Sequence, residues 1–146
     1  GPVMRHHDWD IRLMEYVDQC RDKPFDWADF DCLTFVNECS KKMTGKGFAD
    51  DWLDQDYKCA TSAIRVYKSK LKSANEKDIV AGIDDRLVRS TSLYPRRGDV
   101  VGRQDAKVKG IGLALGIAVS DLVAFIGSDG IEFDQPRDGD IFWAVS

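Results

Sequence analysis

Cys32 is the residue of this chain whose type and position best suit nucleophilic chemistry. It follows Asp31 where a helical pattern begins, so its thiol would lie in the first turn of a helix. The unsatisfied N–H groups and the positive end of a helix dipole favour thiolate over thiol. The same N–H groups can stabilise an oxyanion. The position therefore suits a cysteine nucleophile.

A structural explanation of the same residue competes with this one. Cys32 shares its helical spacing with Phe35, Val36 and Cys39, and a free cysteine is often a small buried apolar residue. Asp31 stands where an N-cap belongs, and its carboxylate can accept from N–H groups two or three residues further on. The Asp-Cys pair is thus explained without catalysis, and both interpretations of Cys32 stay open.

Aromatic residues precede the cysteine. Phe25 and Trp27 could form the wall of a binding groove, or the lid of the core where the loop crosses the helix. We favour the core for Phe25 and leave both roles open for Trp27. Residues 48–57 form a second aromatic and acidic stretch, which contains Trp52. Exposed aromatic residues are common at interfaces, so Trp27 and Trp52 are candidate binding residues. Asp31, beside the cysteine, is the third candidate.

Helical spacing predicts the elements that would position these residues. The first helix runs from Asp8 or Asp10 to about Arg21, and the second from Asp31 or Cys32 to a stop at Gly45. We expect two more helices, over residues 61–72 and over about 79–84. The inward positions are Leu13, Tyr16, Val17 and Cys20 on the first helix, and Cys32, Phe35, Val36, Cys39 and Met43 on the second.

The pattern changes after Gly98. Short apolar runs, "DVVG", "IGLALGIAVS", "LVAFIG", "GIEF" and "IFWAVS", are separated by Gly, Asp and Ser. Such runs are typical of antiparallel strands, and Asp129-Gly130 is typical of a hairpin turn. Helices first and strands second indicate the α+β class, with N-terminal helices packed on one face of a small C-terminal antiparallel sheet.

Composition narrows the classes of function. The 146 residues suit one domain, which we place at 4–146, with residues 1–3 expected to be an expression scar before a native Met4. The net charge of −4 without a basic block argues against a nucleic-acid partner. No apolar run approaches the roughly 20 residues of a membrane span, and no signal peptide is recognisable.

The four cysteines form no CxxC pair and no histidine lies at ligand spacing, so we expect no metal and no cofactor.

One stretch resembles a known family. "FDWADFDCLTF" is similar to the F-x-W-x-x-x-D-C-x-x-F opening of small phage and prophage proteins, which resemble the NlpC-type branch of papain-like cysteine peptidases and amidases. "RRGDVV", "ALGIAVS", "AFIGSDGIEF" and "IFWAVS" follow in the order of that family, so the resemblance covers about residues 12–145. It implies a papain-like, NlpC-like fold, a nucleophile position at Cys32 and a role among phage tail proteins.

The resemblance also exposes a missing base. Active NlpC-type enzymes carry H-V-G-I, whereas the aligned residues here begin with Ala114, and the third polar position falls near residues 125–127, which contain no His, Asn or Gln. The two histidines of the chain, His6 and His7, could reach the cleft only if the terminal segment folds back. A thiolate without a base lacks the usual catalytic constellation.

The resemblance, with its base position unmatched, therefore implies a non-catalytic phage tail-assembly or tail-tip protein on an NlpC-like scaffold. Its expected partners are other phage tail proteins or a host protein, and its expected place is the cytoplasm of the bacterial host during assembly or the virion tail. The alternative is an active cysteine peptidase or amidase that cleaves peptidoglycan peptides with Cys32 as the nucleophile.

Overall fold

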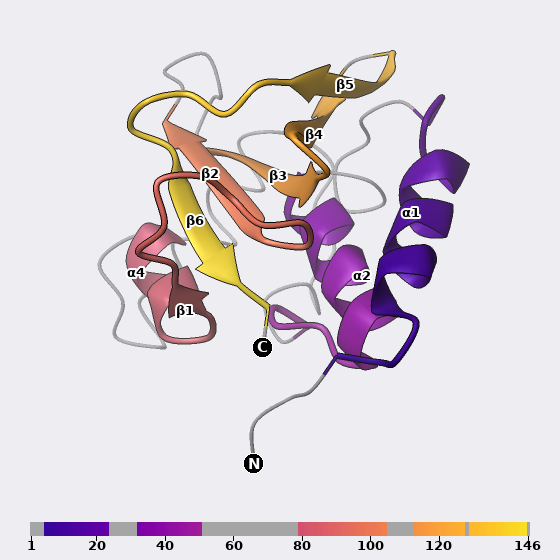
Figure 1. Ribbon diagram of the computed structural model, residues 1–146, viewed down its shortest axis with the longest axis horizontal. Helices are drawn as coiled ribbons and strands as arrows, with labels where there is room; N and C mark the ends of the chain where they lie inside the picture. Colours follow the sequence, from indigo (N-terminus) through magenta and orange to yellow (C-terminus); the bar gives the residue numbers. More distant parts are fainter. Residues whose placement is uncertain (1–4, 24–31, 51–78, 105–112, 128, 146) are drawn as a thin grey trace.

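Six antiparallel strands form one sheet, which lies beside the helices (Figure 1). The computed structural model describes residues 5–23, 32–50, 79–104, 113–127 and 129–145. In chain order the strands are β1 (Val88–Arg89), β2 (Val100–Gln104), β3 (Leu113–Val119), β4 (Leu122–Gly127), β5 (Gly130–Asp134) and β6 (Ile141–Ala144). Their order across the sheet is β1-β6-β2-β3-β4-β5, so β1 and β5 are its edges. The predicted α+β class is confirmed.

Two helices, α1 (Trp9–Gln19) and α2 (Cys32–Thr44), pack against each other in opposite directions (Figure 1). The backbone N–H of His6, just before α1, donates to the carbonyl of Met43 near the end of α2, with an N–O distance of 2.6 Å. The start of α1 is therefore fixed beside the end of α2.

The predicted start of α1 and the predicted end of α2 are confirmed, with one difference in detail. Gly45 ends α2 with a φ of 86°, a left-handed conformation that glycine adopts without strain. Asp8 occupies the N-cap position of α1 but makes no capping hydrogen bond. Its carboxylate instead accepts from the Arg12 guanidinium at 2.7 Å, because an arginine one turn further on competes for it.

Side-chain alternation gives the sheet two different faces. One face, here called the helix face, packs into the main core with α1 and α2, and on β3 it carries Leu113, Leu115, Ile117 and Val119. The residues predicted to point inward from the helices are buried in the same core, except Tyr16 and Cys32, which are half-buried at its border. Each fully buried side chain of this kind stabilises the fold by roughly 1.5–3 kcal/mol.

The opposite face, here called the outer face, has its own small apolar cluster of Val101, Ala118, Val123 and Phe142. Beside it, the Arg103 guanidinium binds both carboxylate oxygens of Asp140, at 3.0 and 2.8 Å, and Oδ2 of Asp134 at 2.8 Å. The same group lies 4.8 Å from the centre of the Phe125 ring. This Arg103 clamp joins β2, the end of β5 and the turn before β6.

A short helix and a short strand close the other side of the sheet. The indole N–H of Trp143 on β6 donates to Asp84 at the end of α4 (Ile79–Asp84), with a distance of 2.8 Å. Arg89 of β1 makes two hydrogen bonds to the same carboxylate, at 3.1 and 2.7 Å. The ring of Trp143 lies so close to Gly102 that a Cβ there would come within 2.8 Å of it, so the position requires glycine.

Five of the strands and the fourth helix lie where the sequence predicts them. The strand β1 was not predicted, because two residues are too few to show alternation and their pairing with β6 depends on a distant part of the chain. The predicted helix over residues 61–72 lies outside the described residues. Within the described ranges, no helix is both long and apolar enough to cross a membrane.

Candidate functional site

The thiol of Cys32 is on α2, of which Cys32 is the first described residue. The predicted start of this helix at Asp31 or Cys32 falls at the edge of the described residues and stays a prediction. The side chain is half-buried and packs against the border of the main core. This placement is compatible with both interpretations, a nucleophile and a packing residue. The expected cap Asp31 and the candidate binding residues Trp27 and Trp52 lie outside the described residues.

The position that the resemblance assigns to a general base holds Ala114, on β3. Alternation along β3 directs its side chain to the outer face with Gly116 and Ala118, whereas α2 packs against the helix face. Ala114 pairs with Arg103 of the neighbouring strand, whose guanidinium is held by the Arg103 clamp. The side chain at position 114 therefore points away from α2 and from Cys32, and β3 contains no histidine.

The two histidines of the chain lie at the other end of α2 from Cys32. His6 is hydrogen-bonded to Met43, and its ring lies beside Gly45. A rise of ~1.5 Å per residue makes the helix roughly 18 Å long from its first residue to its last. The suggested return of the N-terminal segment to the cleft does not occur, because that segment is docked where α2 ends.

The other described thiols behave as core residues. Cys20 and Cys39 are buried, and burial is the main cause that raises the pKa of both thiols. Tyr16, which stacks on Phe35 with a centroid distance of 6.0 Å, also has a raised pKa through burial and its hydrogen bond with Cys20. No disulfide joins the described cysteines, and no group of three or more metal-binding side chains occurs among the described residues.

These environments predict an order of alkylation. With iodoacetamide between pH 7 and 9, we expect Cys32 to react fastest of the three described thiols, because it is half-buried while the other two are buried. Cys39 should stay unmodified until the protein unfolds, since burial keeps its pKa well above the ordinary value. Mass spectrometry of peptides after timed quenching gives the rates. Equal rates for Cys32 and Cys39 in native buffer would contradict the burial of Cys39.

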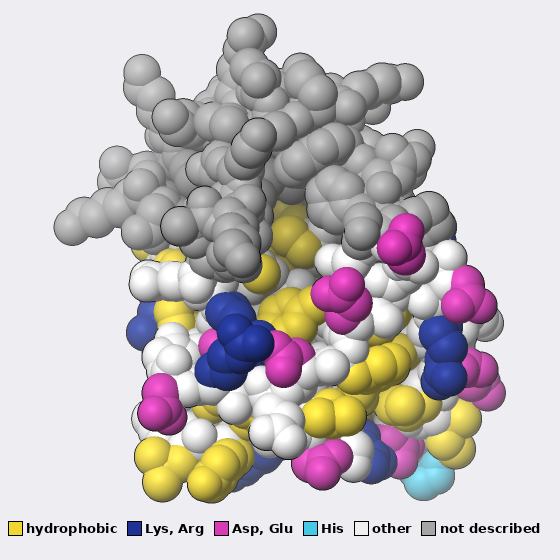
Figure 2. Space-filling view, turned by 90° about the horizontal axis from the view of Figure 1, so that it is seen from above, with side chains coloured by type: hydrophobic (Ala, Val, Ile, Leu, Met, Phe, Trp, Pro, Cys, Tyr) yellow, Lys and Arg dark blue, Asp and Glu magenta, His cyan; other side chains and the backbone are white. Residues whose placement is uncertain are grey.

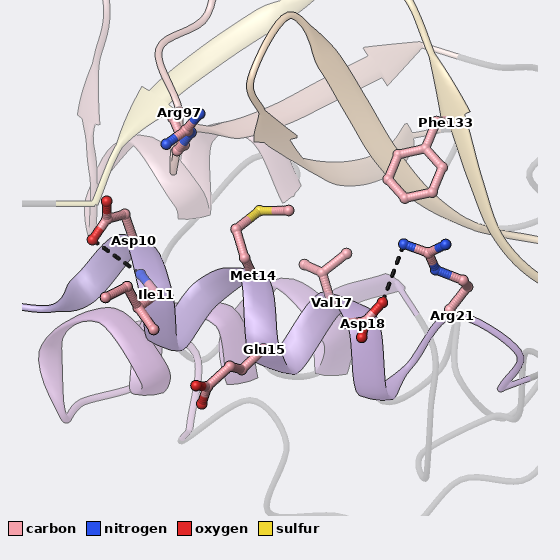
Figure 3. A pocket seen from close by; sticks show the side chains of 9 residues that line it. All are labelled: Asp10, Ile11, Met14, Glu15, Val17, Asp18, Arg21, Arg97 and Phe133. Carbon is pink, nitrogen blue, oxygen red and sulfur yellow. Dashed lines mark hydrogen bonds and ion pairs between the residues drawn. The ribbon is translucent and has the colours of Figure 1, made fainter.

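A second candidate site is a groove of about 460 Å³ between α1 and β5. Figure 3 shows Met14 and Val17 pointing from α1 toward Phe133 of β5, with Arg97 above the start of the helix. Phe133 and Met14 remain 41% and 40% exposed, which is unusual for large apolar side chains that face each other. Figure 2, which looks down on the end of the molecule that carries β5, shows hydrophobic side chains among charged ones. We call this the α1–β5 groove.

Sequence reasoning missed the α1–β5 groove. One sign of the groove is visible in the sequence of α1. Ile11 and Met14 are apolar residues at helical spacing, but they lie outside the predicted inward face. Ile11 is 58% exposed as a result. Nothing local in "GIEFD" shows that Phe133 would face α1, since that depends on how the sheet packs against the helix.

Comparison with known proteins places the chain in a family without assigning its activity. A search of curated proteins found no match, and a search of solved structures found none either. Residues 4–145 match a family described as "Domain of unknown function (DUF6950)". The match covers nearly the whole chain, so the protein belongs to the DUF6950 family.

Proposed function

We propose that this protein is non-catalytic and acts by binding, as a phage tail-assembly or tail-tip protein on an NlpC-like, papain-like scaffold. The observation that carries the proposal is the place of the imidazoles. The residues of β3 that face α2 are Leu113, Leu115, Ile117 and Val119, and the two histidines of the chain belong to the segment docked at the far end of α2.

The argument rests on how cysteine hydrolases work. A positioned base contributes on the order of 10²–10⁴-fold to the rate, and a thiol relies on it to become a nucleophile and to protonate the leaving amine. A helix N-terminus supplies a favourable field for a thiolate, but not the proton transfer that a base provides. A scaffold with this thiol and no imidazole opposite it is better suited to recognition than to hydrolysis.

The phage context comes from the sequence resemblance, and the α+β architecture is compatible with it. Helices packed on one face of an antiparallel sheet agree with the order of elements that the resemblance implies. Partners would be other tail proteins or a host protein, and the α1–β5 groove offers them an apolar surface among charged residues.

The alternative is a cysteine peptidase or amidase that cleaves peptidoglycan peptides. One observation favours it: Cys32 is half-buried rather than buried, at the N-terminal end of the described part of α2. In that case another group would have to act as the base, and the thiol would attack the amide carbonyl beside the N–H groups at the helix start.

Hydrolysis assays separate the two functions. We expect purified wild type and Cys32→Ala to release equal, background amounts of peptide from peptidoglycan fragments, measured by chromatography over a range from pH 5 to 9. An active peptidase added to the same fragments is the positive control. Release by wild type that disappears in Cys32→Ala would overturn the proposal and establish the peptidase.

A further inference from the structure

A pocket of about 570 Å³ lies at the end of the sheet where β3 turns into β4. Three segments line it: residues 94–95 before β2, residues 120–122 at the turn, and residues 135–136 after β5. Its volume falls within the roughly 300–1,000 Å³ of ligand pockets. We call this the loop pocket, and its described lining residues are all different from those of the α1–β5 groove.

Hydrogen bonds made outside the loop pocket hold its three walls. Before β2, the backbone N–H of Gly98 donates to the carbonyl of Ala118 at 2.8 Å, which fastens this segment to the end of β3. The turn itself consists of only two residues, 120–121. After β5, the Arg103 clamp reaches the carbonyl of Gln135 at 2.9 Å. The pocket is therefore largely preformed, and a preformed site spends little free energy on ordering its loops when a ligand binds.

The lining of the loop pocket carries a negative charge and few hydrogen-bond donors. Asp121 is exposed and contributes a carboxylate. Pro95 and Pro136 have no N–H, so their backbone can only accept. Among the described residues that line the pocket, none is Lys, Arg or His. Charge complementarity therefore favours a cationic ligand that is rich in donors.

Tyr94 adds an aromatic ring to the same pocket. It is 74% exposed, so its ring is open to a ligand. A guanidinium is planar, stacks on aromatic rings and binds a carboxylate through two parallel hydrogen bonds. Arg103 of this chain already combines the two contacts, since it lies 4.8 Å from the centre of the Phe125 ring and binds both carboxylate oxygens of Asp140. A ring and a carboxylate in one pocket thus suit an arginine.

We propose that the loop pocket binds an arginine side chain of a partner protein. The proposal rests on the proposed binding function and deepens it by naming a surface and the residue that the surface recognises. Lysine is a poorer occupant, because its ammonium is a strongly hydrated point charge without a planar face. Free arginine is a poorer source, because an exposed ion pair and an exposed cation–π contact are each worth only about 1 kcal/mol or less. The remainder of a partner must add contacts.

The test uses three peptides with blocked ends and the sequence Gly-Ser-Xaa-Ser-Gly, in which Xaa is arginine, citrulline or lysine. Citrulline has nearly the shape of arginine but no charge. NMR titration of the whole 15N-labelled protein at low salt should show the arginine peptide shifting the amide signals of residues 94, 120–122 and 135. The citrulline peptide should bind about tenfold more weakly and the lysine peptide about threefold, because they lose the charge or the stacking face.

Variants locate the binding site. Asp121→Asn keeps the size of the side chain and removes its charge, so it should weaken the arginine peptide by about fivefold and leave the citrulline peptide unchanged. Tyr94→Ser should weaken the arginine peptide by about threefold through the lost ring. Both positions are exposed, so neither change threatens the fold. The matched controls Asp85→Asn and Leu93→Ser, exposed and outside the pocket, should leave affinity at the wild-type value.

Three results would contradict the proposal: equal binding of the arginine and citrulline peptides, shifts centred away from the loop pocket, or unchanged affinity in Asp121→Asn. A dimer in light scattering that Asp121→Asn dissociates would also contradict it, by assigning the pocket to a second copy of this chain. Failure here would leave the non-catalytic function standing. Hydrolysis that depends on Cys32 would end that function without touching the arginine site.

Discussion

Replacing Arg103 with alanine is expected to lower the free energy of unfolding by about 3–5 kcal/mol, the range for breaking a buried ion pair. The side chain of Asp140 is 2% exposed and that of Arg103 12%, so a carboxylate would be left buried without its guanidinium. The same guanidinium also donates to the Gln135 carbonyl at 2.9 Å, and that bond would be lost too. Urea unfolding followed by circular dichroism measures the change.

Arg137→Ala is the matched control for this variant. Arg137 also binds Asp134, at 2.7 Å, but its side chain is 64% exposed. Exposed pairs contribute roughly 0–1 kcal/mol, so this variant should stay close to wild type. If Arg103→Ala and Arg137→Ala lowered stability equally and by less than about 1 kcal/mol, the Arg103 clamp would not be a stabilising feature.

Replacing Trp143 with alanine should cost a similar amount, about 3–5 kcal/mol, through the cavity that the ring would leave. Trp143 is fully buried in the main core and lies against Gly102. Its indole N–H also donates a hydrogen bond from β6 to Asp84 of α4. The variant therefore removes a contact between the sheet and α4. Denaturant unfolding measured by circular dichroism avoids the change in tryptophan fluorescence.

A second variant separates packing from hydrogen bonding. Trp143→Phe keeps most of the ring and removes the N–H, so it should cost less, about 1.5–3 kcal/mol for a bond to a charged group plus a small cavity. Leu93→Ala, at a fully exposed position, should lie within about 0.5 kcal/mol of wild type. Equal stability of Trp143→Ala and Leu93→Ala would show that Trp143 is not a core residue.

The parts of the fold that follow from local spacing were predictable. Leu13 and Val17 on one helix, and Phe35 and Met43 on the other, are buried because spacing along a helix decides which side of it a residue occupies. The five longer strands were also predictable from a local pattern, because each is a short apolar run between turn residues. Within the candidate site, such a pattern could give the place of Cys32 on a helix.

Features that join distant parts of the chain were not predictable. Arg103 meets Asp140 across 37 residues, and the indole N–H of Trp143 meets Asp84 across 59. No local pattern marks these pairs, because each depends on the order of strands in the sheet. The α1–β5 groove is the same kind of feature, since Met14 and Phe133 become neighbours only when the sheet packs on α1.

The strand order has a consequence for how this protein can associate. An open sheet has two edges, and a chain with two usable edges can add copies at both and grow into a fibre. Here β1 has only two residues, and Arg89 is held by Asp84, so that edge offers little to an approaching strand. At the other edge, the N–H of Ile131 on β5 already donates to the carbonyl of Arg21 at 2.9 Å. Both edges are thus restricted, which disfavours open-ended polymerisation through pairing of edge strands.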